Sequence, residues 1–347
     1  MVEYLAGNRI IGNTAERPNA GVGGWVELAR NTLGSAGDLL DSGTFTAKQY
    51  LCVQIYTKNS GTINHAIKYN GDSGNNYAFR RNLDGGSDIT DVNQSNDPTI
   101  SMSSLGGFPL YATIFITNNT SKEKLTIAHT GMQNTAGNHA PKRRKGVVKW
   151  ANTSAQITQI TVTNGDSGSY DTGSEIVVLG WDPADTHTTN FWEELASVEL
   201  TSAGDILNSG TFTAKKYLWV QSFTKGTGGA TRSSYTMNSD TGNYSYRYSV
   251  DDAGDATGAG QANLYFNSNT TGNTFTNSYI INNSSTEKIV ISDVSKATST
   301  GALSATVREE NVGKWSNTSS QITSIQMLNS GAGSFDIGSI IKVWGSD

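Results

Sequence analysis

Residues 42–48 read SGTFTAK, and the same seven residues return unchanged at positions 209–215. The segment that follows, from Gln49 to Lys58, has the two-residue period of a β-strand. Leu51, Val53 and Ile55 fall on one face of that strand, and Tyr50, Cys52, Gln54 and Tyr56 fall on the other. Because both faces are fairly apolar, we expect a central strand that is covered on two sides.

The match between the two segments extends along almost the whole chain. Residues 25–29 return at 192–196 at an offset of 167, the offset is 164 for residues 118–124, and it is 165 for residues 149–158. Loops of unequal length explain these changes. A unit this long is a whole domain, since solenoid and propeller repeats run about 20 to 50 residues. We predict an N-terminal arm at 1–24, repeat 1 at 25–182, a short polar linker at 183–191 and repeat 2 at 192–347.

Other short strands are predicted at residues 110–117, 124–129, 156–163 and 175–181, each with a counterpart in the second copy. Turn sequences separate them, such as NGDSG at 70–74 and DGG at 84–86, whose residues tolerate positive φ. Helical periodicity is confined to short pieces such as residues 189–196. The predicted fold class is all-β, with two tandem antiparallel β-sandwich domains that are jelly-roll-like and related by internal duplication.

Composition and charge exclude several classes of protein. The formal net charge of −5 argues against a general nucleic-acid binder, which needs a broad basic surface. Cys52 is the only cysteine, so the chain can form neither an intramolecular disulfide nor a cysteine-based zinc cluster, and a buried thiol is expected. The first residues lack the pattern of a secretory signal, and no apolar run approaches the roughly 18 residues of a membrane span. We expect a cytoplasmically made protein without a cofactor.

One dense basic run and its acidic counterpart are the first candidate binding site. The run is Lys142, Arg143, Arg144 and Lys145, and the second copy has Val307, Arg308, Glu309 and Glu310 at the equivalent positions. If the run lies at a loop tip, unlike charges in the two copies favour head-to-tail contact between subunits or docking of the two domains. A solvated charged loop is the simpler alternative.

Two acidic clusters occupy equivalent positions in the two copies. They contain Asp84 and Asp88 in the first copy, and Asp251, Asp252 and Asp255 in the second. Carboxylates in glycine-rich loops can coordinate calcium, although these lack the full ligand pattern of an EF-hand, and turn-forming aspartates are the simpler interpretation. The four histidines, His65, His129, His139 and His187, all lie before the second copy and show no metal-binding spacing.

Aromatic residues gather near predicted turns and beside the linker. They include Tyr77, Phe79, Tyr244, Tyr246 and Tyr248, while Trp181 and Trp192 flank the linker. Sugar-binding sandwiches stack CH groups of a sugar on exposed rings beside polar side chains, but core or interdomain packing would also explain this set.

The chain resembles tandem-repeat proteins associated with the virions of marine viruses and phages. The resemblance covers nearly the whole chain and rests on YLAGNRI at 4–10, SGTFTAKKYLWV at 209–220, GWDPADTHTTNFWEELA at 180–196 and KVWGSD at 342–347. It implies a virion-associated structural or adhesive role, and it supplies no functional residues to transfer.

These observations predict a non-enzymatic viral structural protein of a capsid surface, spike or tail, which acts by self-assembly and by attachment to a host surface. The expected partners are further copies of the chain, other virion proteins and a host-surface glycan. A carbohydrate-binding module or lectin is the alternative. A glycan-cleaving enzyme would need a paired carboxylate site, and no acidic pair stands out beyond the turn clusters.

Overall fold

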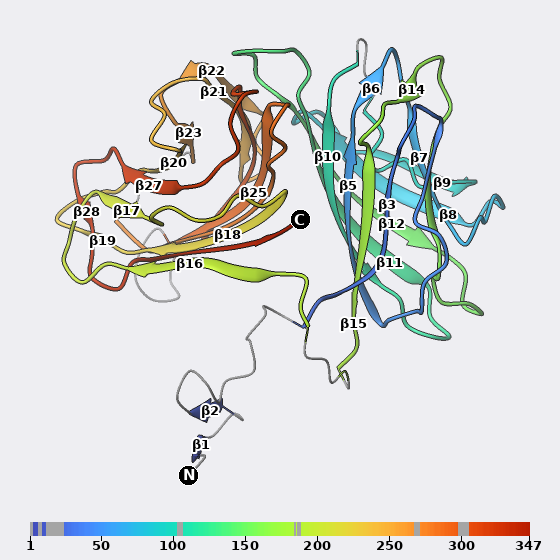
Figure 1. Cartoon of the computed structure of the whole chain (residues 1–347), viewed down its shortest axis with the longest axis horizontal. Helices are drawn as coiled ribbons and strands as arrows, with labels where there is room; N and C mark the ends of the chain where they lie inside the picture. The colour runs from blue at the N-terminus through green and yellow to red at the C-terminus, as the bar shows by residue number, and fades with distance from the viewer. Residues whose placement is uncertain are drawn as a thin grey trace.

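The computed structural model describes residues 3–5, 9–11, 24–102, 107–183, 185, 189–266, 271–297 and 305–347. The described residues form antiparallel β-strands arranged as two sandwiches side by side (Figure 1). We call residues 24–183 the first half and residues 189–347 the second half. Ahead of them, β1 (Glu3–Leu5) pairs with β2 (Arg9–Ile11).

The first half is built on one large sheet of eight strands. Its order is β3 (Val26–Thr32), β15 (Glu175–Trp181), β5 (Tyr50–Thr57), β10 (Leu110–Thr117), β11 (Lys124–Met132), β12 (Lys142–Trp150), β8 (Tyr77–Leu83) and β9 (Ile89–Gln94). A small sheet of β4 (Leu39–Asp41), β13 (Ile160–Asn164) and β7 (His65–Tyr69) forms the second layer, and β14 (Ser169–Tyr170) pairs with β6 (Asn59–Ser60).

The second half repeats the order of the large sheet, and its small sheet has one strand more. The large sheet runs β16 (Glu193–Glu199), β29 (Ile340–Ser346), β18 (Tyr217–Thr224), β24 (Thr274–Ile281), β25 (Lys288–Lys296), β26 (Val307–Trp315), β21 (Tyr244–Val250) and β22 (Ala256–Gln261). The small sheet is β17 (Ile206–Asn208), β27 (Ile325–Asn329), β20 (Ser233–Met237) and β23 (Leu264–Tyr265), and β19 (Gly226–Thr227) pairs with β28 (Ser334–Phe335). The predicted duplication of an antiparallel sandwich is therefore confirmed.

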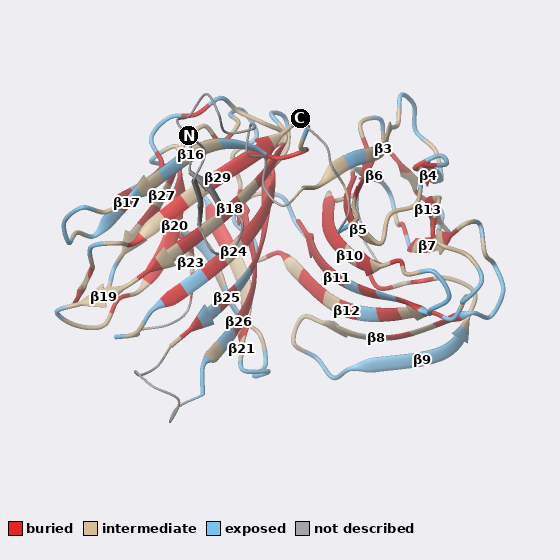
Figure 2. Cartoon of the chain, turned by 90° about the horizontal axis from the view of Figure 1, so that it is seen from below, coloured by how far each residue is buried: buried red, intermediate tan, exposed pale blue. Residues whose placement is uncertain are grey.

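Three apolar cores hold the molecule together. One lies between the large and small sheets of the first half, and a second lies between those of the second half. The third lies between the two large sheets and includes Cys52 and Tyr56 of β5 and Ile291 of β25. The predicted two-sided strand is confirmed at β5, because Leu51, Val53 and Ile55 belong to the first core. Figure 2 shows buried residues along β10 and β11 and along β18 and β24, where the halves meet.

Local predictions succeeded unevenly. Asn70 and Asp84 have φ of 53° and 51°, as the predicted turns require. The predicted strand at 156–163 begins later, as β13 at Ile160. The helical pattern at 189–196 is wrong, because β16 begins at Glu193 and pairs with β29. Pairing with a neighbouring strand overrides a local pattern this short.

Candidate functional site

The facing sheets of the two halves meet through equivalent residues. Phe115 on β10 packs against its equivalent Tyr279 on β24, with ring centroids 6.0 Å apart. Trp25 packs on Phe115 at 6.4 Å, and its equivalent Trp192 packs on Tyr279 at 6.2 Å. Each half thus contributes an equivalent tryptophan-packed aromatic ring to the contact.

The basic run lies within this contact, and its setting corrects one prediction. Lys142 to Lys145 begin strand β12, whereas the sequence placed them at a loop tip. Side chains alternate along a strand, so Arg143 and Lys145 face the second half while Arg144 points into the first sandwich. Arg143 bonds to Asp255 at 2.6 Å and Glu310 at 2.7 Å.

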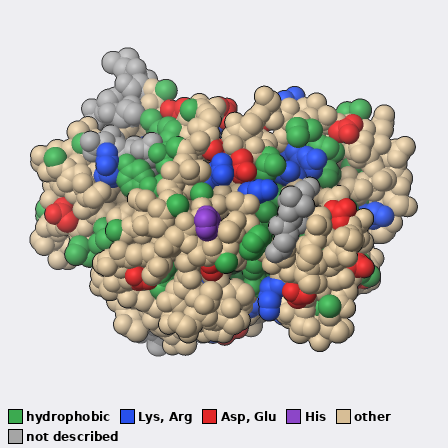
Figure 3. All heavy atoms as spheres, turned by 90° about the horizontal axis from the view of Figure 1, so that it is seen from above, with side chains coloured by type: hydrophobic (Ala, Val, Ile, Leu, Met, Phe, Trp, Pro, Cys, Tyr) green, Lys and Arg blue, Asp and Glu red, His purple; other side chains and the backbone are tan. Residues whose placement is uncertain are grey.

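Lys145 on the same strand forms further ion pairs with the second half. Lys145 bonds to Glu310 at 2.8 Å and to Asp293 at 3.1 Å. Burial opposes ionisation of Glu310, but the charges of Lys145, His129 and Arg143 outweigh burial and hold its pKa below the ordinary value. The sequence left open contact between subunits, docking of the two domains and a solvated loop. These contacts join the two domains within one chain. Viewed from above, hydrophobic, basic and acidic side chains lie together across the middle of the molecule (Figure 3).

The other members of the predicted charge site have different settings. Arg308 is exposed and pairs with Asp252 at 2.6 Å. Glu309 is buried on the inner side of the second sandwich, where it pairs with Lys296. Glu309 and Arg144 therefore do not meet across the interface, because both belong to the inward-facing set of their strands.

The aspartates of the two acidic clusters mostly contact arginines. Asp255 and Asp84 face Arg247 at 3.8 and 3.2 Å, and Asp88 pairs with Arg80 at 2.9 Å. Asp251 accepts the backbone N–H of Arg308 at 2.9 Å. Across the ranges that the structure describes, no three His, Cys, Asp or Glu residues gather to hold a metal ion.

Glu175 at the start of β15 is an interface residue that the sequence did not reveal. Its carboxylate accepts a hydrogen bond from Tyr217 Oη at 2.6 Å and pairs with Lys216 Nζ at 2.8 Å, both in the second half. Burial opposes ionisation of Glu175, yet Lys216, Thr32 and Tyr217 hold its pKa below the ordinary value. A lone acid at the start of an apolar strand was the only sequence signal.

The histidines are separated in space. His65 is fully buried in the first sandwich, where burial and then the charge of Arg144 lower its pKa to about 3. His129 lies in the interface with Nδ1 3.8 Å from Asp293. His139 is in the β11–β12 connection, and His187 lies outside the described residues.

The predicted aromatic set divides between cores and surface. Trp192 is buried in the core between the halves, whereas Trp181 is half-buried and stacks on Tyr50 with centroids 5.4 Å apart. Tyr77, Phe79 and Tyr244 are buried in the sandwiches. Tyr246 and Tyr248 pack on each other at 5.9 Å.

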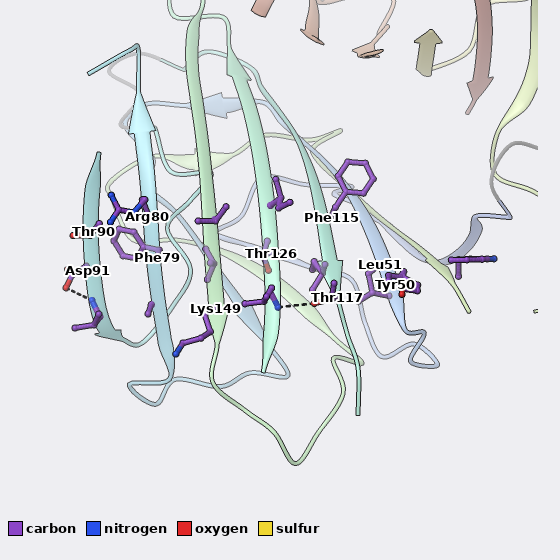
Figure 4. A pocket seen from close by; sticks show the side chains of 18 of the residues that line it. Tyr50, Leu51, Phe79, Arg80, Thr90, Asp91, Phe115, Thr117, Thr126 and Lys149 are labelled. Carbon is purple, nitrogen blue, oxygen red and sulfur yellow. Dashed lines mark hydrogen bonds between the residues drawn. The ribbon is translucent and has the colours of Figure 1, made fainter. Parts of the chain in front are cut away.

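The first large sheet leaves part of its outer face uncovered, and this apolar face is the most distinctive surface of the molecule. It carries an open hollow of about 820 Å³, which residues of β5, β8, β9, β10, β11 and β12 line together with Trp25 and Trp181 (Figure 4). Val92, Leu125, Ile127 and Val147 are 63, 55, 55 and 47% exposed. Few polar side chains reach the hollow, among them Arg80, Asp91 and Lys149.

The corresponding row of apolar residues in the second half is covered. Ile289, Ile291 and Val312 stand at the positions of Leu125, Ile127 and Val147, and each is at most 2% exposed. Gly131 of the first half lies directly over them, because a Cβ there would fall 2.6 Å from Val312 Cγ1 and 2.8 Å from Ile289 Cγ2. At this row the first half therefore covers the second, while the equivalent row of the first half stays open.

Comparisons with known proteins add little to this description. No family model matches the chain, and no curated protein matches it. Among solved structures, domains LG4-5 of the mouse laminin alpha1 chain align at 12% identity over 94% of this chain and 91% of that one, with a TM-score of 0.20. The binding domain of botulinum neurotoxin DC aligns at 9% identity over 87% of this chain and 94% of that one, with a TM-score of 0.13. At these TM-scores neither likeness supports an inference about function.

No helix capable of crossing a bilayer occurs among the residues that the structure describes.

Proposed function

We propose that the chain is a non-enzymatic structural protein that assembles with a second copy of itself through the exposed face of the first large sheet. One observation carries this proposal: Leu125, Ile127 and Val147 are exposed, whereas their equivalents form a buried domain contact in the same molecule. Contiguous apolar surface of this kind marks protein interaction sites.

The choice of a second copy rests on continuity with the contact already present. Phe115 belongs to the edge of the core between the halves and also lines the apolar hollow, so the uncovered face continues an existing interface. Closed homodimers are commonly two-fold, and a two-fold contact sets identical patches against each other. Two apolar sheet faces can pack in this way about 10 Å apart, as in sandwiches.

The test is the molar mass in solution, measured by size-exclusion chromatography with light scattering. We expect the wild-type chain, whose monomer is 36.9 kDa, to elute with twice that mass. Ile127→Asp places a charge in the face and should yield monomers with unchanged secondary structure. Ile337→Asp is the matched control, since Ile337 is equally exposed at 55% but lies in the β28–β29 turn of the second half, and it should remain dimeric.

Two results would contradict the proposal. A wild-type chain that stays monomeric at high micromolar concentration would remove it. A dimer that survives Ile127→Asp but is lost in Ile337→Asp would place the contact on another surface.

The proposal extends to the place where this assembly occurs, which is a virion. The sequence resemblance to virion-associated proteins supports this extension. On this proposal the chain belongs to a capsid surface, spike or tail, and host attachment is a second role. Neighbouring genes for portal, terminase or capsid proteins are the expected finding, and a genomic context without any of them would argue against the viral role.

Carbohydrate binding is the second candidate function. The observation that favours it is the aromatic end of the hollow, where half-buried Trp181 stacks on Tyr50 and Trp25 lies nearby. The scarcity of polar side chains weighs against it, because sugar hydroxyls need hydrogen-bond partners. Glycan-array binding that is lost in Trp181→Ala and kept in Ile127→Asp would favour the lectin role over assembly.

A further inference from the structure

Two arginines lie side by side on the inner face of the first large sheet. Arg81 on β8 is opposite Gly146, and Arg144 on β12 is opposite Leu83, so the arginines are diagonal neighbours on adjacent strands. Both donate to the same backbone oxygen: Arg81 Nη1 lies 2.7 Å from the carbonyl oxygen of Pro98, and Arg144 Nη1 lies 3.4 Å from it. One neutral carbonyl is thus shared by two cations.

Neither arginine has an anionic partner in the described part of the chain. No carboxylate there lies within 4.0 Å of either guanidinium, whereas four cations of the interface between the halves each have one, namely Arg30, Arg143, Lys145 and Lys216. Arg144 is only 6% exposed, and the Nε–H groups of Arg81 and Arg144 are both buried without an acceptor. Burying an unpaired charge is costly, so this arrangement calls for a counterion.

Asp97, the carboxylate whose charge acts most on Arg81, is engaged elsewhere. It accepts hydrogen bonds from the backbone N–H and hydroxyl of Thr99, at 2.8 and 2.5 Å, and from Tyr69 Oη at 3.1 Å. The negative charges of Asp97 and Asp91 favour the charged form of Arg81, and the negative charge of Asp84 favours the charged form of Arg144. Burial and then the charge of Arg81 nevertheless lower the pKa of Arg144 to about 10.

Neutral hydrogen-bonding groups lie around Arg144. Thr130 is its register partner on β11, and the Thr130 hydroxyl is buried without a partner. His65 is close enough to feel the charge of Arg144, its Nδ1 has no partner, and it packs on Tyr170 with centroids 5.4 Å apart. The Tyr170 hydroxyl is likewise unpartnered. Such unsatisfied groups are rare in native interiors.

The second half provides an internal control for this reasoning. Its residue at the position of Arg144 is Glu309, which pairs with Lys296, and Lys296 stands at the position of Met132. The buried charge is therefore balanced within the second sandwich. In the first sandwich the same site holds an arginine and a methionine, and the balancing anion is missing from the described side chains.

We propose that the first sandwich binds a small oxyanion, inorganic phosphate or sulfate, between Arg81 and Arg144. Guanidinium N–H groups match the oxygen atoms of these anions in geometry and charge. The Thr130 hydroxyl supplies a neutral donor on the Arg144 side. Arg81 is half-buried and forms the solvent side of the site, and the burial of Arg144 limits the ligand to a small free ion.

Isothermal titration calorimetry of the full chain with sodium phosphate tests this site. We expect one phosphate per chain, and affinity weakened about tenfold or more in Arg144→Met, as for loss of a charge-assisted hydrogen bond. Arg308→Met should bind like the wild type, since it removes an exposed arginine elsewhere. Arg81→Met provides a second variant in case Arg144→Met fails to fold.

Thermal unfolding separates specific binding from general salt effects. Phosphate should raise the wild-type Tm along a saturable curve, whereas any rise in Arg144→Met should be the smaller, non-saturable one that kosmotropic salts cause. Equal phosphate responses in the wild type, Arg144→Met and Arg81→Met would overturn the proposal. Binding of phenyl phosphate in place of the inorganic ion would overturn its assignment to a small free anion.

Discussion

Strands β11 and β25 are equivalent, yet they have opposite surroundings. Leu125 and Ile127 of β11 are exposed on the outer face of the first sheet, whereas Ile289 and Ile291 of β25 are buried beneath the first half. The difference arises on the covering side, because Gly131 lets the first half approach closely and its equivalent in the second half is Ser295. A duplicated pair of domains can thus bury an apolar row on one domain and leave the equivalent row on the other domain free for a partner.

The largest difference in stability between equivalent substitutions is expected at the charged residues. Arg143→Ala should destabilise the chain by about 3–5 kcal/mol, because it leaves buried Asp255 without its closest partner and removes one of the two cations that pair with Glu310. Its equivalent Arg308 is 55% exposed, so Arg308→Ala should cost no more than about 1 kcal/mol. Urea denaturation measures the free energy of unfolding of both variants. Equal losses of stability would show that the two arginines contribute equally.

The apolar rows provide the second comparison. Ile291→Ala should cost about 2–5 kcal/mol, since it opens a cavity in the core between the halves. Ile127→Ala should change the free energy of unfolding by about 0.5 kcal/mol or less when measured at a concentration where the chain is monomeric. A large loss for Ile127→Ala under those conditions would mean that the face is already covered.

The third prediction concerns the residue that makes the contact asymmetric. Gly131→Ala should cost about 1–3 kcal/mol, because the added Cβ would press on Val312 and Ile289. Ser295→Ala, at the equivalent position, should stay within about 0.5 kcal/mol. Chemical denaturation measures the free energy of unfolding of both variants. A Gly131→Ala variant as stable as the wild type would contradict the steric explanation.

The smallest effect expected is a pH dependence confined to the first half. His65 has a folded pKa of about 3 against about 6.5 when unfolded, so its neutral form contributes stability that is full above pH 6.5 and is lost as the pH falls toward 3. At pH 5.5 the loss should be about 1.4 kcal/mol.

His65→Gln should remove that slope between pH 7 and 5.5. The free energy of unfolding is measured by urea denaturation at each pH. If its pH dependence were unchanged in His65→Gln, the effect would belong to another group.

Several features of this fold were predictable from local pattern alone. The repeat of SGTFTAK, the alternation of residues 49–58 and the turn residues Asn70 and Asp84 led to the sandwich class, its duplication and a strand with two buried faces. The charge difference between the basic run and Glu310 was visible in the sequence, and Arg143 and Lys145 pair with Glu310. The loop tip was wrong, because the basic run begins strand β12 and its side chains alternate between the two faces of the sheet. The arginines that pair with Asp84 and Asp255 come from distant strands, which the sequence did not reveal.

The sequence by itself determined the class of each sandwich, since a two-residue period and turn chemistry act over a few neighbouring residues. Only the tertiary structure decided that Leu125 is exposed while Ile289 is buried, and that Glu175 joins the halves. The same holds for Arg144, which has no counterion among the described residues while Glu309 has one. These outcomes depend on how two nearly identical sheets dock, and docking is set by contacts between residues more than a hundred positions apart.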